Sequence, residues 1–237
     1  MRKCQAVLSM LFYLLTMQSF AAVSFYSETL CKQKGFVCRK VEREDSWSSL
    51  FPKEDERRLV KRLNRMNGFL KLNTVIAVPK TLEGKSLSDF SPFPNHDQHY
   101  REKTIVVDQE KMAWAAYNAF GQLVRWGPIS AGSQQCFDKK EGCSTPTGSF
   151  RIFKKRGRHC FSKTYPKRLS AENGGAYMPY CMFFYKGYAL HGSQNLPGYH
   201  SSHGCVRLLV EDAKWLYQQF VDLPSTDRQG TKLIVLP

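Results

Sequence analysis

The chain has 237 residues, which is enough for one ordinary domain and a smaller second one. Hydrophobic residues make up 42% and aromatic residues 13%, a globular composition that excludes an intrinsically disordered chain. Lys and Arg number 35 against 20 Asp and Glu, a net charge of +15, so we expect an anionic partner, with nucleic acid, acidic lipid and an anionic polymer all compatible.

Residues 1–21 have the features of a secretory signal peptide. Two basic residues open the segment, a short apolar run covers residues 7–15, and Ser19 and Ala21 stand at the −3 and −1 positions of a cleavage site. An uncleaved membrane anchor is the alternative, but the apolar run is short for a membrane span. We therefore expect an exported, periplasmic protein with no stable membrane insertion and no nucleic-acid partner.

Residues 25–80 are predicted to form a small α+β domain. A strand-like run covers residues 37–41, an amphipathic helix residues 54–66, and a second strand residues 74–78. The predicted order of the whole is strand, helix, helix, strand. Residues 81–103 carry Ser, Pro, His and Asp without periodicity and are predicted to be a linker.

From residue 104 to residue 237, short β-rich segments dominate. The predicted strands are 104–107, 112–117, 123–126, 148–153, 182–185, 188–190 and 232–236. One helical stripe, residues 210–220, follows an acidic pair. The pattern predicts a mainly β fold, a sandwich or barrel with a short C-terminal helix. Its Trp114 and Trp126, like Trp47 of the first region, are predicted core residues.

Eight cysteines are present, and seven of them follow the signal peptide. In an oxidising compartment six are expected to pair, and six cysteines allow 15 connectivities. We favour Cys31–Cys38, Cys136–Cys143 and Cys160–Cys181, because the first two pairs each close a short local loop. The remaining Cys205 is then informative, since an exposed free thiol is a liability unless it does chemistry.

The richest chemistry lies in Ala189–Ser193 and in Ser201–Leu208. Together they provide the thiol of Cys205, two imidazoles and an arginine two residues past the thiol. An imidazole or inward-facing backbone N–H groups can populate the thiolate, and a glycine before the cysteine lets backbone amides approach a reacting carbonyl. In an extended segment Arg207 shares the face of Cys205, where it can hold a substrate carboxylate.

Residues 104–235 resemble the L,D-transpeptidase (YkuD-like) catalytic domain. The resemblance rests on an ordered set of motifs: Asp108-Gln109, Ser130-Ala131-Gly132, Thr145–Phe150, Met178-Pro179-Tyr180, Leu190-His191-Gly192 and Ser202–Leu208. It implies that Cys205 is the nucleophile and His191 its base. It further implies that His203 supports the site, that the amides of Gly204 and Cys205 form an oxyanion hole, and that Arg207 lies near the substrate.

The resemblance also implies a reaction. Cys205 attacks a peptidoglycan tetrapeptide stem, D-alanine leaves, and the acyl group passes to an amine to form a cross-link, with no metal or organic cofactor and with thioester trapping by carbapenems. The loop between His191 and Ser202 is short for the family, which affects substrate detail. Ser202, Gly192 and Tyr199 are predicted to bind substrate with Arg207, and His200 is a further ligand candidate.

The first region has a fainter resemblance to a LysM module. Its motifs are Glu44–Leu50, Leu63-Asn64 and Leu72–Pro79, which suggest wall-glycan binding. The alternative is a small scaffold that only packs on the second domain, since glycines usual in the LysM motif are absent.

Other functions stay open. If water is the acceptor, the protein is an L,D-carboxypeptidase or hydrolase of the same bond. If Cys205 is unreactive, it is a non-catalytic peptidoglycan-binding protein. A zinc site is disfavoured because the Cys and His residues lack close paired spacing. The basic run 154–158 is expected to be a solvated loop, with contact to an anionic glycan or lipid as the alternative.

Overall fold

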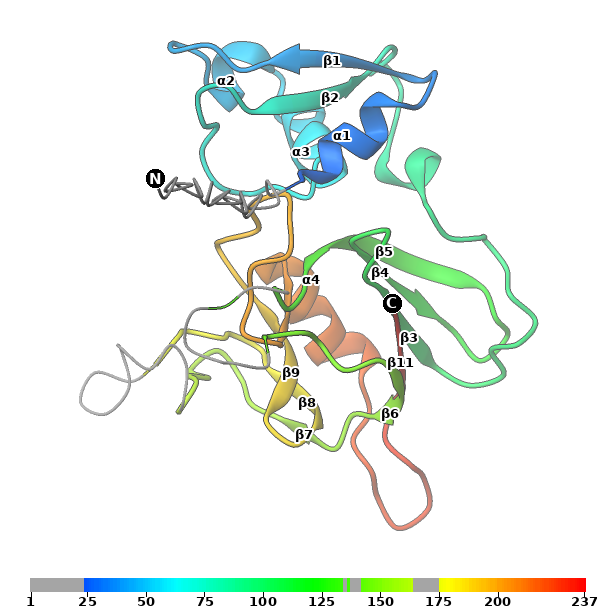
Figure 1. The fold of residues 1–237 in the computed structure, drawn as a ribbon. Helices are drawn as coiled ribbons and strands as arrows, with labels where there is room; N and C mark the ends of the chain where they lie inside the picture. The colour runs from blue at the N-terminus through cyan, green and yellow to red at the C-terminus, as the bar shows by residue number, and fades with distance from the viewer. Residues whose placement is uncertain (1–23, 134–135, 137–141, 164–174) are drawn as a thin grey trace, which may run out of the picture.

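The structure is a computed structural model that describes residues 24–133, 136, 142–163 and 175–237. A small N-terminal unit, residues 24–80, lies above a larger C-terminal unit, residues 104–237, and a connecting segment joins them (Figure 1). The predicted signal peptide lies outside the described residues. Within the described part of the chain, no helix is both long enough and apolar enough to cross a membrane.

The N-terminal unit packs three short helices against a two-stranded antiparallel sheet. Its elements are α1 (Tyr26–Cys31), β1 (Phe36–Lys40), α2 (Trp47–Leu50), α3 (Glu54–Leu63) and β2 (Val75–Pro79). A capping box begins α2: Ser46 Oγ accepts the Ser49 N–H, and Ser49 Oγ accepts the Ser46 N–H. From β1 onward the elements follow the predicted order of strand, helix, helix and strand, with α1 added in front.

The C-terminal unit is built on one mixed sheet, which has nine strands among the described residues. These are β3 (Thr104–Asp108), β4 (Ala113–Tyr117), β5 (Leu123–Ser130), β6 (Gly148–Arg151), β7 (Lys154–Lys155), β8 (Met182–Tyr185), β9 (Tyr188–Gly192), β10 (Val206–Leu208) and β11 (Lys232–Leu236). Their spatial order is β6-β11-β3-β4-β5-β10-β9-β8-β7. Neighbours are antiparallel except for the parallel pairs β11/β3 and β10/β9.

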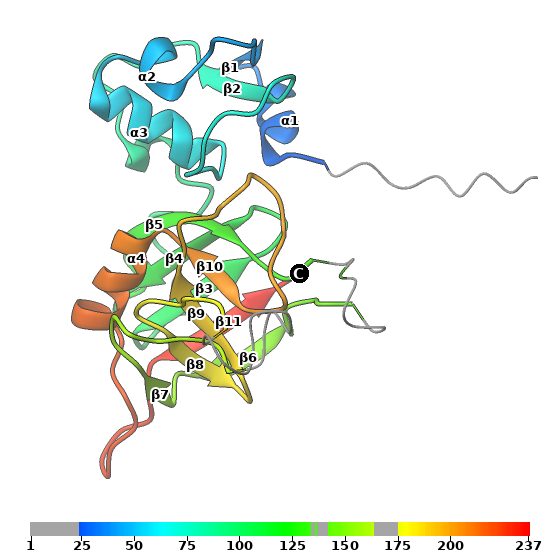
Figure 2. The same ribbon diagram turned by 90° about the vertical axis from the view of Figure 1, so that its left-hand side faces the viewer.

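The sheet curls so that strands near its opposite ends meet. Phe150 of β6 contacts Phe184 and Tyr185 of β8, with ring centroids 5.2 and 5.6 Å apart. Helix α4 (Val210–Trp215) continues into a π-helical turn, η3 (Leu216–Phe220), and packs on the sheet, as Figures 1 and 2 show. The predicted fold class is therefore confirmed: a curled, mainly β domain with a short C-terminal helix, preceded by a small α+β region.

Several boundaries differ from the prediction for physical reasons. Helix α3 ends at Leu63 instead of residue 66, because Arg65 takes a left-handed φ of +59°. Strand β5 runs on to Ser130, and the three-residue strand β10 was not predicted. Strand β10 is short and forms only because β5 and β9 flank it.

The two units share one hydrophobic core, to which Leu59 and Leu63 of α3 contribute beside the buried residues of the sheet. At their interface, Arg62 of α3 donates two hydrogen bonds of 3.1 Å to the carboxylate of Asp212, which is fully buried at the start of α4. Arg125 of β5 donates a third at 2.8 Å. Removing one partner of such a buried network leaves an uncompensated charge, so the network holds the units together.

The connecting segment also packs against the sheet. Trp126 Nε1 donates to the carbonyl of Leu87, in the 3₁₀ turn η1 (Leu87–Phe90), at 3.0 Å. Farther along, the Tyr117 hydroxyl donates to the Pro94 carbonyl at 2.9 Å. Trp47, Trp114 and Trp126 are buried, which confirms their prediction as core residues.

The three favoured disulfides, Cys31–Cys38, Cys136–Cys143 and Cys160–Cys181, are all present, and Cys205 stands outside them. The first ties the end of α1 to the middle of β1.

Candidate active site

A cleft of about 920 Å³ opens beside β9 and β10. Between residues 195 and 207 every second residue lines it. These residues are Asn195, Pro197, Tyr199, Ser201, His203, Cys205 and Arg207. Ser202 and His191 line the same cleft. Cys205 and Arg207 both line the cleft.

The turn that carries Cys205 is held by its own residues. Ser202 Oγ accepts the Gly204 N–H at 3.0 Å and donates to the Cys205 carbonyl. Gly204 has a φ of +115°, and a Cβ there would lie 2.4 Å from the Tyr188 ring, so only glycine fits. The Ser202 hydroxyl is thus committed to shaping the turn, and the Gly204 amide is engaged inside it.

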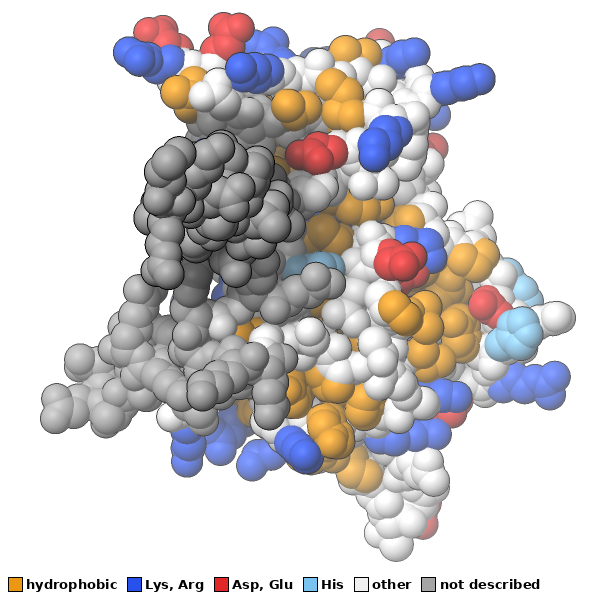
Figure 3. All heavy atoms as spheres, in the orientation of Figure 1, with side chains coloured by type: hydrophobic (Ala, Val, Ile, Leu, Met, Phe, Trp, Pro, Cys, Tyr) orange, Lys and Arg blue, Asp and Glu red, His pale blue; other side chains and the backbone are white. Residues whose placement is uncertain are grey.

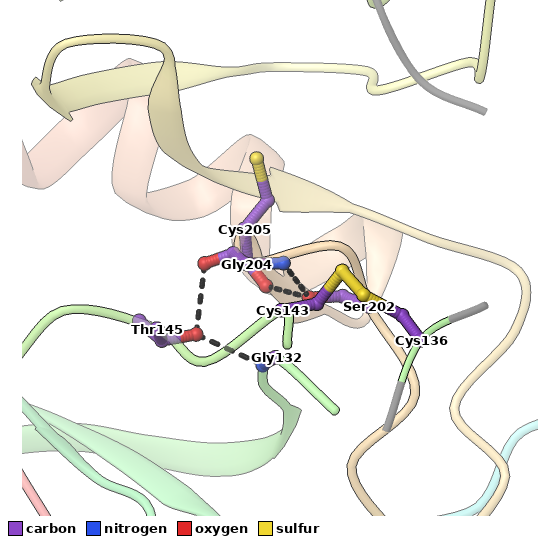
Figure 4. Close-up of a disulfide and its surroundings, with 7 residues drawn as sticks. All are labelled: Gly132, Cys136, Cys143, Thr145, Ser202, Gly204 and Cys205. Atoms are coloured by element: carbon purple, nitrogen blue, oxygen red, sulfur yellow. Dashed lines mark hydrogen bonds between the residues drawn. A yellow bond between two sulfur atoms is a disulfide. The ribbon is translucent and has the colours of Figure 1, made fainter. Parts of the chain in front are cut away.

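Thr145 fastens this turn to the neighbouring chain (Figure 4). Its Oγ1 accepts the Gly132 N–H at 2.9 Å and donates to the Gly204 carbonyl at 2.8 Å. Thr145 is only 3% exposed, so water does not readily replace these bonds. Figure 4 shows the Cys205 side chain pointing away from the nearby Cys136–Cys143 disulfide.

His191 stands on β9 opposite Arg207 of β10 in the parallel pair. Its Nδ1 lies 2.9 Å from the Gly192 carbonyl. A carbonyl only accepts, so Nδ1 carries the proton and Nε2 keeps its lone pair. Burial lowers the pKa of His191 to about 4, aided by the charge of Arg207 and opposed by the bond to Gly192. At pH 7 the ring is a neutral imidazole that can accept a proton at Nε2.

Arg207 interacts both with the thiol of Cys205 and with Ser201 in the loop that precedes Cys205. Its Nη1 donates to Ser201 Oγ at 2.9 Å. Burial lowers the pKa of Arg207, while its interactions with Cys205 and Tyr199 raise it. The guanidinium stays charged at neutral pH, and a cation beside a thiol favours the thiolate.

Tyr199, predicted to bind substrate, and His203, predicted to support the site, both line the cleft. Tyr199 is half-buried, and its ring meets that of Phe25 from the N-terminal unit edge-on, with centroids 5.2 Å apart. His203 is half-exposed on the cleft wall. Tyr199 therefore joins the N-terminal unit to the cleft.

Gly192 and His200 lie behind the cleft wall. Gly192 is buried, and its carbonyl accepts the bond from His191, so its contact is with the imidazole. His200 Nδ1 accepts the Ala131 N–H at 2.9 Å, which leaves Nε2 to donate to the Gln109 carbonyl at 2.9 Å. His200, a ligand candidate by sequence, is thus occupied on both ring nitrogens by the main chain.

The described lining of the cleft holds six Lys and Arg side chains and no Asp or Glu: Lys71, Lys154, Arg156, Lys163, Lys186 and Arg207. Lys71 comes from the N-terminal unit, and sequence reasoning missed it because no local pattern marks it. Figure 3 shows further basic side chains along the upper edge of the N-terminal unit and the lower part of the C-terminal unit. The cleft is therefore suited to an anionic ligand.

The basic run 154–158, expected to be a solvated loop, is partly built into the fold. Lys155 Nζ donates to the carbonyls of Tyr217 and Val221 at 2.8 and 2.7 Å, where η3 ends. Burial lowers the pKa of Lys155. Lys154 and Arg156 on either side line the cleft.

Comparisons with known proteins agree on one family. The family described as YkuD, the L,D-transpeptidase catalytic domain, matches residues 102–235. A curated Bacillus subtilis protein named "Putative L,D-transpeptidase YciB" is 32% identical over 124 residues, which are 50% of this chain and 62% of that protein. The chain thus spans less than two thirds of that relative's length.

Solved L,D-transpeptidase structures are similar as well. One from Xylanimonas cellulosilytica is 22% identical with a TM-score of 0.49, covering 75% of this chain and 76% of that one. Another from Stackebrandtia nassauensis is 25% identical with a TM-score of 0.46, covering 62% and 61%.

Proposed function

The chain belongs to the YkuD family of L,D-transpeptidase catalytic domains, and we propose that it acylates Cys205 with a peptidoglycan stem peptide and passes the acyl group to an amine. One observation carries the proposal. A thiol outside any disulfide stands on a cation-lined cleft that it shares with a neutral imidazole and an arginine.

In the first step the Cys205 sulfur attacks the carbonyl carbon between the L-centre of diaminopimelate and the terminal D-alanine. His191 accepts the thiol proton at Nε2 and returns it to the nitrogen of the leaving D-alanine. The carbon–nitrogen bond breaks and a thioester remains. Splitting one displacement into two lowers the barrier of each, and backbone N–H groups stabilise the oxyanion.

For the amides of Gly204 and Cys205 to form an oxyanion hole, the hydrogen bond of the Gly204 N–H must change. Since the Gly204 N–H donates to Ser202 Oγ, it exchanges this partner for the substrate oxygen as the tetrahedral intermediate forms. In the second step an amine attacks the thioester carbon, His191 takes the amine proton, and the Cys205 thiol is regenerated as the cross-link forms.

The charge of the cleft supports a stem-peptide substrate. Such peptides carry several carboxylates, and the charged side chains of the described cleft wall are all cationic, apart from its two histidines. Arg207 can bind a carboxylate bidentately, whereas the lysines act as point charges. We propose that the cleft prefers stems with free carboxylates over amidated stems.

We further propose that the protein acts in the periplasm. The predicted signal peptide supports export, and three disulfides are typical of proteins that mature in an oxidising compartment. Glycan binding by the LysM-like N-terminal unit remains a prediction. Co-sedimentation of the Cys205→Ser protein with glycan strands stripped of stem peptides tests it, because no thioester forms in that variant.

The first experiment is intact mass spectrometry of the purified protein after incubation with a carbapenem. The wild type is expected to gain the mass of one carbapenem on Cys205. The matched variant Cys205→Ser is expected to gain no mass and to keep the melting temperature of the wild type, which shows that it is folded. A wild type that gains no mass while its three disulfides are intact would indicate a non-catalytic binding protein.

The second experiment separates the acceptors. The wild type is incubated with a disaccharide tetrapeptide, with and without an excess of a diaminopimelate-containing acceptor peptide. A cross-linked product that depends on the acceptor supports the transpeptidase. Tripeptide product at the same rate in both reactions shows that water is the acceptor, and the protein is then an L,D-carboxypeptidase.

A further inference from the structure

The loop of residues 193–201, here named the cleft loop, joins β9 to the turn that carries Cys205. Its odd-numbered residues from Asn195 onward line the cleft, and none of its even-numbered residues does. Leu196 is fully buried, and Gly198 packs where a Cβ would lie 3.1 Å from Met66 Cε. Figures 1 and 2 both show the loop rising from the C-terminal unit toward the N-terminal unit.

Asn67 of the N-terminal unit holds the middle of this loop. Its Nδ2 donates to the Ser193 carbonyl at 2.8 Å, and its Oδ1 accepts the Leu196 N–H at 2.7 Å. Its own N–H donates to the Leu196 carbonyl at 3.1 Å. One asparagine thus satisfies three main-chain groups of the cleft loop, as a neighbouring strand would do.

Two further residues of the N-terminal unit complete the attachment. The Arg65 carbonyl accepts the Gly198 N–H at 3.1 Å, and the Tyr26 N–H donates to the Gly198 carbonyl at 2.8 Å. The Arg65 guanidinium is buried and donates to the Lys111 carbonyl of the C-terminal unit at 3.0 and 3.3 Å. The attachment point is therefore itself fixed to the sheet.

The C-terminal end of the cleft loop contacts residues next to the proposed nucleophile. The Ser130 hydroxyl donates to the Tyr199 carbonyl at 2.7 Å, and Ser201 Oγ accepts from Arg207 at 2.9 Å. A shift of the loop therefore moves Tyr199 and the partner of Arg207 together. Asn67 itself is not among the described residues that line the cleft.

We propose that Asn67 is a positioning residue for the acyl transfer, and that the N-terminal unit braces the cleft loop so that the substrate-facing wall is complete. This inference rests on the proposed function. It assigns the N-terminal unit a part in the active site that is separate from any binding of glycan.

The test compares Asn67→Ala with Asn118→Ala in the full-length protein. Asn118 likewise bonds main-chain N–H groups, those of Phe120 and Gln122, but in an exposed turn away from the cleft. Hydrogen exchange of the Leu196 and Gly198 amides is measured first. We expect Asn67→Ala to speed their exchange by about tenfold or more, and Asn118→Ala to leave it unchanged.

Kinetics on the stem peptide provide the second readout. We expect Asn67→Ala to lower kcat/KM about tenfold, mainly through KM, because two side-chain hydrogen bonds to the loop are lost. Alkylation of Cys205 by iodoacetamide, which needs no cleft wall, should keep its rate. Asn67→Asp keeps an acceptor for the Leu196 N–H but turns a carboxylate oxygen toward the Ser193 carbonyl, so its effect should be at least as large as that of Asn67→Ala.

The outcomes separate the two proposals. A wild type that does not process the stem peptide refutes the proposed function. Equal exchange at Leu196 and Gly198 in the wild type and in Asn67→Ala refutes the brace, whatever the activity. Faster exchange with unchanged kcat/KM and KM refutes the role of Asn67 in positioning the substrate wall.

Discussion

Replacing Thr145 with Val tests whether one buried hydroxyl holds the turn that carries Cys205. Val has nearly the same shape, so the change removes the hydroxyl and little else. The Gly132 N–H and the Gly204 carbonyl then lose partners at 2.9 and 2.8 Å. Each buried group left without a partner costs about 1–3 kcal/mol, so with two such groups we expect the free energy of unfolding to fall by about 2–6 kcal/mol.

Urea unfolding followed by tryptophan fluorescence measures this loss, with a lower midpoint and an unchanged slope. We also expect acylation of Cys205 by a carbapenem to slow by about tenfold. Such a change corresponds to a rise of about 1.4 kcal/mol in the activation free energy, which is part of the energy lost at the turn. Thr145→Ser keeps the hydroxyl and is the matched control, expected to remain within about 1 kcal/mol of the wild type. If Val and Ser behave alike in stability and acylation, the reasoning is wrong.

Three further predictions follow from charges. Lys71→Ala should raise KM for a carboxylate-rich stem about two- to fivefold. Lys40→Ala removes an equal charge from β1 and should leave KM unchanged. Equal effects of the two substitutions on KM would mean that only the net charge of the protein matters. Asp212→Asn should lower the free energy of unfolding by about 3 kcal/mol, and an unchanged urea midpoint would contradict the interface network. Because the pKa of His191 is lowered to about 4, the unfolded chain binds a proton between pH 6.5 and 4 that the folded chain does not. As the pH is lowered through that window, His191 should therefore reduce the free energy of unfolding by up to about 1.4 kcal/mol per pH unit. His191→Gln should remove this contribution and make the fall in stability shallower, while the lowered pKa of the buried His200 keeps its own share.

The sequence was most informative where structure is local. Two disulfides close loops with a sequence separation of seven residues, and pairing by proximity placed them correctly. The spacing of two residues between Cys205 and Arg207 indicated that both could face the same side, and both do line the cleft. The ordered motifs of the C-terminal unit likewise indicated the family, because each keeps its local spacing.

Long-range contacts explain what was missed. Asn67 bonds Ser193 across 126 residues, and nothing in the sequence around either one indicates the other. Lys71 reaches the cleft only because the N-terminal unit docks beside the sheet. The segment 81–103 has the composition of a linker, yet η1 packs on Trp126, since burial of apolar surface there outweighs the turn-forming local preference.

His200 shows the same division between local and tertiary information. Its position beside Tyr199 made it a ligand candidate, but its side chain faces away from the cleft and bonds Ala131 and Gln109. The sequence by itself determined the family and the two disulfides that close short loops, because these depend on short spacing. Only the tertiary structure decided the tautomer of His191, the cationic cleft and the brace at Asn67, because these depend on which distant groups become neighbours when the core is buried.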